Sequence, residues 1–473
     1  IQAAAKVDVS ASVAGGRAGH VGLQGESLSL AGTVAAHAGS GASSGSVDVD
    51  VGKLASFSAL NGSLNSGGFT DERHVRVRSG DVVIVAGDSV NARRVILAAD
   101  AGRIDVVGTV GNGAAEGGAQ VALYAATGLH LSAGSQILAQ GADVGARGGE
   151  VRLSTRSGTL DFDSNATIDV RAGIAGAAGS VTFGIERDAT GVLSPTHLQG
   201  LVRRQGAVAG DVAASVDVEA TRTYRGAEVG SALGSTRIAQ LASDHAAFVA
   251  ASTATAPAVI GGLRDESGPL TSARLLGATE LLADGNLSLD ANWDLTNSQW
   301  LAANKPGTLT LRAAGDLTLR DTLGGNRSSS SQDTNHAIRS GDTWNIRLVA
   351  GADLQSADTL ATKNPAAPGA TVAQLLLTGA NAGVRTGTGR IDLAASGDVR
   401  LDSPTSAIYS AGRIGAADTE TNGNNRWAVD GGGITITAGG SVIGAAGGTD
   451  LWVTDWLRRP RLLLNQFNLQ SFP

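Results

Sequence analysis

The chain has 473 residues, with 67 glycines, 9 prolines and only 3% aromatic residues, and 42% of its residues are hydrophobic. Compact cores usually rely on aromatic side chains, so this composition argues against an ordinary globule, while the hydrophobic content argues against disorder. The net charge of −7 disfavours a nucleic-acid partner, and the absence of cysteine excludes disulfides and thiolate metal sites.

The beginning of the chain indicates a fragment or a processed product. The chain contains no methionine, and it starts at Ile1 within a patterned stretch. No signal peptide is visible, and no apolar run approaches the roughly 20 residues that a membrane-spanning helix needs. We therefore expect any export signal to lie upstream of Ile1.

Residues 1–184 carry a repeat of about thirty residues that predicts an arm of parallel β-helix. Apolar pairs at positions i and i+2 predict short strands with one buried face. Three such strands per repeat predict a triangular coil, and successive coils would stack in parallel ~4.8 Å apart. The residues that recur are Val121 and Leu123, Val151 and Leu153, Val181 and Phe183, with Leu129 and Leu131, Leu160 and Phe162, and Ile137, Ile168 and Val170 between them.

One acidic cluster in this arm, Asp161 and Asp163 with the nearby Asp169, is a candidate site. Alternate carboxylates on one strand face are candidates for binding Ca²⁺ or for a polysaccharide-cleaving site. The interpretation that we favour is that Leu160 and Phe162 point inward, so that Asp161 and Asp163 face solvent.

Residues 185–280 form a predicted insertion or subdomain, because the apolar pairs fade there. Ser235 starts a pattern typical of a capped amphipathic helix, with apolar residues at helical spacing. These apolar residues are Ile238, Leu241, Phe248 and Val249. The insertion is expected to cover an edge or face of the β-helix or, alternatively, to bind a ligand.

Residues 281–450 form the predicted second arm. Apolar pairs recur there at an offset of eight residues, as in Leu309 and Leu311 followed by Leu317 and Leu319. Corners such as Ala-Ala-Gly-Asp supply the glycine that sharp bends with positive φ require. The predicted fold class is therefore all-β, a right-handed parallel β-helix (solenoid) with an irregular, partly helical insertion. An antiparallel sandwich or barrel is the alternative. Its hairpins would need Asn-Gly or Asp-Gly turns between consecutive strands, and the sequence does not regularly place such turns there.

Residues 451–473 form an aromatic tail that we expect to cap the β-helix, pack on its side or contact another subunit. Capping matters because an open end leaves backbone groups unpaired. The candidate interface residues of this tail are Trp452, Trp456, Phe467 and Phe472.

The repeats at residues 384–412 (VRTGTGRIDLAASGDVRLDSPTSAIYSAG), with GTLTLRAAGDLTLRD and GGGITITAGGSVIG, resemble filamentous-haemagglutinin-family exoproteins. The resemblance covers about residues 21–183 and 287–442. It implies a β-helical protein of a Gram-negative bacterial surface, exported by two-partner secretion through an outer-membrane transporter. The family's amino-terminal secretion domain has no counterpart at Ile1, which leaves that route an analogy.

We therefore expect an extracellular structural or adhesive scaffold, not an enzyme, without cofactors or metal ions. Its expected partners are other copies of itself, neighbouring surface-protein segments or glycans. A sharper form of this expectation is that copies stack end to end into a surface filament. The alternatives are a polysaccharide-cleaving β-helix enzyme and an inert stalk for an effector domain. The seven histidines are isolated in the sequence and are expected to be solvated or in loops, with His245 structural on the predicted helix.

Overall fold

A computed structural model describes residues 1–12, 14–111, 118–205, 213–325, 341–364, 371–414 and 428–445. The chain is mostly strand (43%) in parallel sheets, with little helix (11%), so the predicted all-β class with parallel, solenoid-like stacking is confirmed. Two compact units are described in turn: Ile1–Ala220 with Thr253–Leu275 and Gln355–Asp358, and Thr221–Ser252 with Leu276–Leu354 and Thr359–Pro473. Strands β20 (Ser215–Arg225) and β24 (Arg274–Ala283) and helix α2 (Ser235–Ile260) each contain residues of both units.

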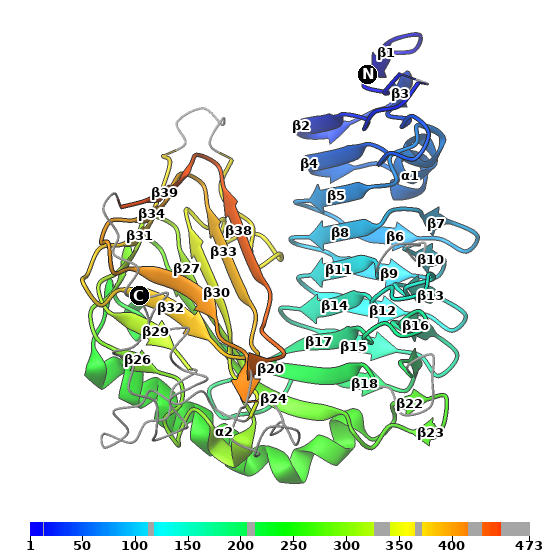
Figure 1. Cartoon of the computed structure of the whole chain (residues 1–473). Helices are drawn as coiled ribbons and strands as arrows, with labels where there is room; N and C mark the ends of the chain where they lie inside the picture. Colours follow the sequence, from blue (N-terminus) through cyan, green and yellow to red (C-terminus); the bar gives the residue numbers. More distant parts are fainter. Residues whose placement is uncertain are drawn as a thin grey trace, which may run out of the picture. The chain divides into compact units, whose positions relative to one another are not determined.

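The strands of the first unit form three sheets in which each strand pairs mainly with its parallel counterpart one repeat away (Figure 1). Its first sheet contains β2 (His20–Leu28), β4 (Ser46–Leu54), β5 (Glu72–Val77), β8 (Arg94–Ala99), β11 (Gln120–Ala125), β14 (Glu150–Thr155) and β17 (Ser180–Arg187). The second contains β6 (Val82–Ile84), β9 (Arg103–Val106), β12 (Gly128–Leu131), β15 (Thr159–Phe162) and β18 (Thr196–Leu198). The third contains β7 (Ser89–Val90), β10 (Thr109–Val110), β13 (Gln136–Leu138), β16 (Thr167–Asp169), β19 (Leu201–Arg203), β22 (Arg264–Asp265) and β23 (Gly268–Pro269). Short strands β1 (Lys6–Asp8) and β3 (Thr33–Ala35) pair separately.

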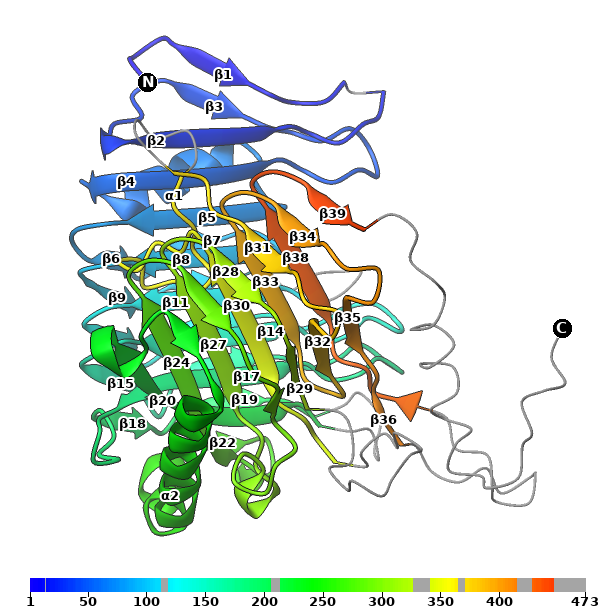
Figure 2. The same cartoon turned by 90° about the vertical axis from the view of Figure 1, so that its left-hand side faces the viewer.

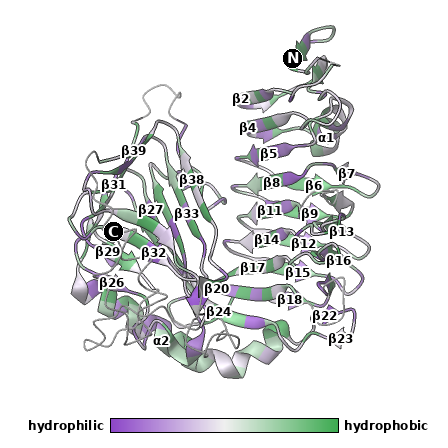
Figure 3. Cartoon of the chain, viewed as in Figure 1, coloured by the Kyte–Doolittle hydropathy of each residue, from purple (hydrophilic) through white to green (hydrophobic). Residues whose placement is uncertain are grey.

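The strands of this unit pair in the register that the thirty-residue repeat predicts. Val121 on β11 lies opposite Val151 on β14, which in turn lies opposite Val181 on β17. Leu129 and Leu160 are partners in the second sheet, and the third sheet follows the same rule. These aliphatic side chains are buried, whereas polar residues alternate with them along the strands (Figure 3). The inward residues of each strand therefore pack on those of the next strand in the sheet.

Helix α1 (Phe57–Ser66), which the sequence analysis did not predict, lies between β4 and β5. The Ser56 hydroxyl accepts a hydrogen bond from the Ala59 amide at 3.2 Å and so caps its first turn. Phe57, Leu60 and Leu64 form its buried face, at the spacing of one side of a helix. The helix contacts β3, β6 and β7, the last two being the first strands of the second and third sheets. It therefore covers the start of those two sheets.

The second unit repeats the three-sheet plan with longer connections. Figure 2 shows its first sheet in the order β24, β27 (Thr308–Ala313), β30 (Asn345–Ala350), β33 (Ile391–Ala395) and β38 (Ile434–Ala438). The second contains β21 (Ala232–Leu233), β25 (Leu287–Leu289), β28 (Leu317–Leu319), β31 (Leu375–Leu377), β34 (Val399–Leu401) and β39 (Val442–Gly444). The third contains β26 (Trp293–Asp294), β29 (Thr322–Gly324), β32 (Gly383–Thr386) and β35 (Ala407–Ser410). Strands β36 (Arg413–Ile414) and β37 (Ala428–Val429) form an antiparallel pair, and η1 (Gly226–Glu228) and η2 (Ala302–Asn304) are single 3₁₀ turns.

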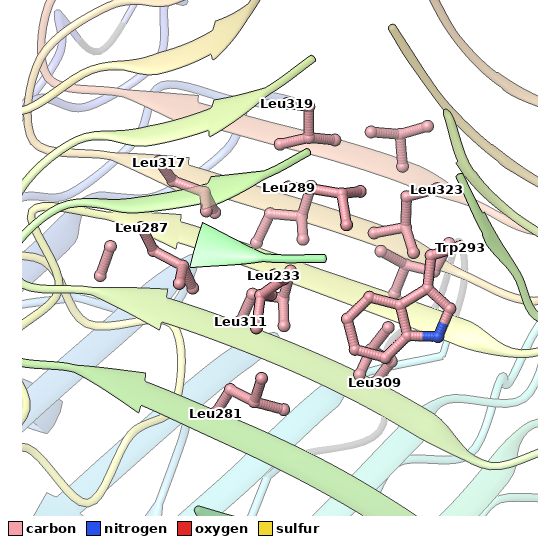
Figure 4. Packing of buried hydrophobic residues seen from close by; sticks show 14 of the residues in the cluster. Leu233, Leu281, Leu287, Leu289, Trp293, Leu309, Leu311, Leu317, Leu319 and Leu323 are labelled. Carbon is pink, nitrogen blue, oxygen red and sulfur yellow. The ribbon is translucent and has the colours of Figure 1, made fainter. Parts of the chain in front are cut away.

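Leucines form stacked layers in the core of this unit (Figure 4). Leu281 on β24, Leu311 on β27 and Leu348 on β30 are consecutive register partners, and all three are buried. Leu287 and Leu317 continue the pattern in the second sheet. The apolar pairs that predicted the second arm are thus buried register partners on successive strands.

Helix α2 begins at Ser235, where the sequence analysis placed the start of an amphipathic helix, and within the second unit it packs on this core. Ile238 and Leu241 belong to the same buried cluster as Leu281 and Trp300. His245 is fully buried, with its ring centre 5.4 Å from that of Trp300 and 4.8 Å from that of Trp344. In the described part of the chain, no helix is both long and apolar enough to cross a membrane.

Glycines at the predicted corners serve two different needs. Gly351 has a φ of 64°, which fits the predicted bend with positive φ. Gly397 does not, and the positive-φ explanation is wrong for it. A Cβ atom there would lie 2.9 Å from the carbonyl oxygen of Ala373, so the residue is small because two coils approach closely. The corner at Gly397 therefore requires glycine because a Cβ atom has no room there, whereas the corner at Gly351 requires glycine for its positive φ.

Candidate functional site

The outer face of the second sheet of the first unit carries alternating carboxylate and imidazole side chains. Asp105 on β9, His130 on β12, Asp161 on β15 and His197 on β18 are register partners in that order. Apolar residues alternate with them on β9, β12 and β15 and are buried. Because successive side chains point to opposite faces of a strand, the four polar groups lie outside the core. We call these four residues the histidine–aspartate row.

Polar contacts along the row hold its side chains in place. The Nδ1 atom of His197 lies 2.7 Å from Oδ1 of Asp161. The Nη2 atom of Arg103 lies 2.7 Å from Oδ1 of Asp105. His130 is engaged from the side, because its Nε2 atom lies 3.2 Å from Oδ2 of Asp163, just beyond β15. All these side chains are at least partly exposed, so water is able to compete for every one of the contacts.

The two predicted calcium ligands have different partners. Asp163 accepts a hydrogen bond from the amide of Ala133 at 3.1 Å in addition to its contact with His130, whereas Asp161 faces His197. Among the described residues, no group of three or more His, Asp or Glu side chains is placed to hold a metal ion. Leu160 and Phe162 point into the core, as predicted, so the carboxylate of Asp161 faces outward.

A hydroxyl, an imidazole and a carboxylate follow one another at the edge of the row. The Oγ atom of Ser132 lies 3.5 Å from Nδ1 of His130, whose Nε2 faces Asp163. Acyl transfer also needs backbone N–H groups aimed at a developing oxyanion. The amides of Ala133 and Gly134, which follow the serine, are bonded to Asp163 and to the carbonyl of Asn165. The geometry therefore fits a hydrogen-bonding surface better than a nucleophilic centre.

A second group of histidines lies on the outer face of the first sheet of this unit. Asp48 on β4 has His20 Nε2 at 3.4 Å and His74 Nδ1 at 3.5 Å. Burial opposes ionisation of Asp48, but His74, His20 and Arg94 outweigh it and lower the pKa of Asp48. Burial likewise opposes the charged form of His74, but nearby carboxylates, Asp48 first among them, outweigh it and raise the pKa of His74. The group thus favours an ion pair.

Of the histidines expected to be solvated or in loops, four lie on strands, and two of these, His20 and His197, are exposed to solvent. His20, His74, His130 and His197 lie on strands and face aspartates of neighbouring coils. A signal for one of them, His130, was present in the repeat. Leu129 and Leu160 recur in register, so the next residue of each strand must also be paired across the coils.

The aromatic residues Trp452, Trp456, Phe467 and Phe472, proposed above as an interface, lie outside the described residues. Comparisons of the chain with protein families, with curated proteins and with solved structures find no match. The support for the histidine–aspartate row as the candidate site therefore comes from its geometry and not from a related protein.

Proposed function

We propose that the chain is a structural and adhesive scaffold of a bacterial surface, built as a right-handed parallel β-helix. The observation that carries this proposal is the pairing of each strand with its counterpart one coil away. Val95, Val121, Val151 and Val181 are register partners through four successive coils of one sheet. Such stacking gives a stiff body whose stability rests on contacts between neighbouring coils, which suits a scaffold.

The histidine–aspartate row is the proposed contact face of this scaffold. Strand spacing sets its polar groups ~4.8 Å apart. Carboxylates accept hydrogen bonds from hydroxyl groups and imidazoles both donate and accept them, so the row suits a hydroxyl-rich polysaccharide. Each contact is weak at an exposed surface, and binding would rest on many contacts acting together.

The wider assignment is to the filamentous-haemagglutinin-like exoproteins of the bacterial surface. The repeated segments GDLTLRD and GDVRLD, which contain strands β28 and β34 of the second unit, support it. Under this proposal the chain acts outside the cell, is exported through an outer-membrane transporter, and contacts other copies of itself or neighbouring surface segments. Sedimentation as a monomer at high concentration, with no fibres in electron micrographs, would count against self-assembly.

The contact face is tested with immobilised alginate, pectin and host-type glycans in a binding assay. We expect the native chain to bind at least one of them, and a His130→Ala/His197→Ala variant to bind about tenfold more weakly because two row contacts are lost. A His20→Ala/His37→Ala variant removes two exposed histidines outside the row and is expected to bind like the native chain. Equal binding by both variants, or none by the native chain, contradicts the proposed face. New reducing or unsaturated ends in the glycans would instead favour the polysaccharide-cleaving alternative.

A further inference from the structure

The last repeat of the second unit has strands in the first and second sheets but, among the described residues, none in the third. Strands β38 and β39 end the first and second sheets, where they pair with β33 and β34 of the preceding repeat (Figure 2). The third sheet ends one repeat earlier, at β35, whose partner in the described part of the chain is β32. The outer edge of β35 is therefore the place where a third strand of the last repeat would pair.

The inward positions of the last two strands are apolar and exposed. They are Ile434 and Ile436 on β38 and Val442 on β39, with exposed fractions of 42%, 36% and 57%. The register partners of these three residues in the preceding repeat are at most 2% exposed. We call the three residues the exposed end, because the side chains at equivalent positions are buried elsewhere in the sheets. An apolar edge of this kind requires a cover.

The spacing of the two preceding repeats indicates which residues would supply the missing strand. In both of them, an inward residue of the third sheet follows the last inward residue of the second sheet by seven positions. Val384 follows Leu377 in this way, and Ile408 follows Leu401. Gly444 is the register partner of Leu401 in the last repeat, so the equivalent position of the third sheet is residue 451.

Residue 451 is a leucine within a segment that alternates like a strand. Leu451 and Val453 are apolar residues at positions i and i+2, with Trp452 between them. If Leu451 faces inward beside Ile408, then Trp452 faces outward beside Tyr409, and two aromatic rings meet on adjacent strands. Residues 446–473 lie outside the described residues, so the assignment rests on the register of the described strands and on the sequence.

We propose that residues 450–454 pair with β35 as the missing strand, with Leu451 beside Ile408, and that residues 455–473 cover the exposed end. The occupant is this segment of the same chain and not a second copy, because a short loop ties it to β39 and gives it a high local concentration. Residues 455–473 carry the large apolar side chains that a cover needs, namely Trp456, Leu457, Leu462, Leu463, Leu464 and Phe467. This proposal concerns the second unit alone and is independent of the histidine–aspartate row.

Disulfide formation between introduced cysteines tests the register, because the chain has no cysteine of its own. In the proposed register, Tyr409→Cys and Trp452→Cys are neighbours ~4.8 Å apart on adjacent strands, a separation that a disulfide spans. Mild oxidation should therefore link them within one molecule. In the matched pair, Tyr409→Cys with Thr454→Cys, the second cysteine lies two residues further along the strand and should be linked at least about tenfold more slowly. Non-reducing gels and peptide mass spectrometry measure both rates and separate links within a chain from links between chains.

Leu451→Asp provides a second test that needs no cross-link. A carboxylate at an inward position should displace the added strand, so that the backbone amides of β35 exchange with deuterium at least about tenfold faster. Thr454→Asp introduces the same charge at a position that is proposed to face outward, and it should leave the exchange of β35 unchanged.

The proposal is overturned if the two cysteine pairs are linked at equal rates, if the first pair is not linked, or if the two aspartate variants exchange alike. Links formed mainly between molecules would also overturn it, and they would assign the exposed end to a second copy of the chain. Native exchange in β24 and β27, together with thermal unfolding of the reduced cysteine variants and of the aspartate variants, verifies that each variant is folded.

Discussion

His197 and Asp161 face each other on adjacent strands of the first unit, with Nδ1 of one 2.7 Å from Oδ1 of the other, although 36 positions separate them in the sequence. Neither residue belongs to a recognisable motif. The contact follows from register, because Leu160 and Phe162 are fixed in the core and the residue between them must face outward. The polar row is thus a consequence of the apolar repeat.

This relationship predicts that substitutions at two neighbouring residues of β15 lower the free energy of unfolding by different amounts. Leu160→Ala should lower the free energy of unfolding by about 2–5 kcal/mol, because it leaves a cavity in a fully buried layer. Asp161→Ala should cost less than about 1 kcal/mol, because its pairing with His197 is partly exposed to water. Urea unfolding of both variants measures the difference, and similar losses would contradict the assigned faces.

The aromatic cluster of the second unit should report on the docking of α2. Trp344 donates a hydrogen bond from Nε1 to the carbonyl oxygen of Trp300 at 3.0 Å, and their rings meet edge to face at 5.3 Å. Trp300→Ala should destabilise the unit by about 3–5 kcal/mol. It should also weaken the near-ultraviolet circular dichroism signal. An unchanged spectrum together with an unchanged unfolding curve would show that these rings do not pack as described.

His74 should give the first unit a measurable pH dependence of stability. Its pKa is raised by carboxylates that outweigh the effect of burial, so its stabilising contribution is complete below pH 6.5 and disappears as the pH rises through the raised pKa. The contribution should stay below about 1 kcal/mol, because the side chain is partly exposed. His74→Gln should flatten this part of the stability profile between pH 5 and pH 9, as followed by thermal unfolding. A profile that keeps its full slope would assign the dependence to another group.

The sequence predicted the sheets best where two inward residues share a strand. Val121 and Leu123 on β11 are such a pair, and their thirty-residue recurrence gives the observed register. Strands β18 and β19 have one buried residue each, Leu198 and Val202, so no pair at i and i+2 exists to be recognised. This explains why the pattern fades between about residues 185 and 203 although strands continue.

The repeat pattern does not predict helix α1 or the contacts of the histidine–aspartate row, and the reasons differ. Phe57, Leu60 and Leu64 have helical spacing, but the helix is only ten residues long and lies within a stretch dominated by strand patterns. The contact of Asp163 with His130 depends on how the chain turns after β15, which a periodic pattern does not specify.

The most direct test of the account is the spacing of side chains along the histidine–aspartate row. The chain has no native cysteine, so spin labels can be attached at pairs of introduced cysteines. Labels at His130→Cys and Asp161→Cys occupy adjacent register positions and should broaden each other's spectrum strongly, at a separation of roughly one strand spacing of ~4.8 Å plus the label arms. Labels at Asp105→Cys and Asp161→Cys lie two strands apart and should interact clearly less. Equal spectra for the two pairs, or no broadening in the first, would contradict the in-register parallel stacking on which the scaffold and its contact face both rest.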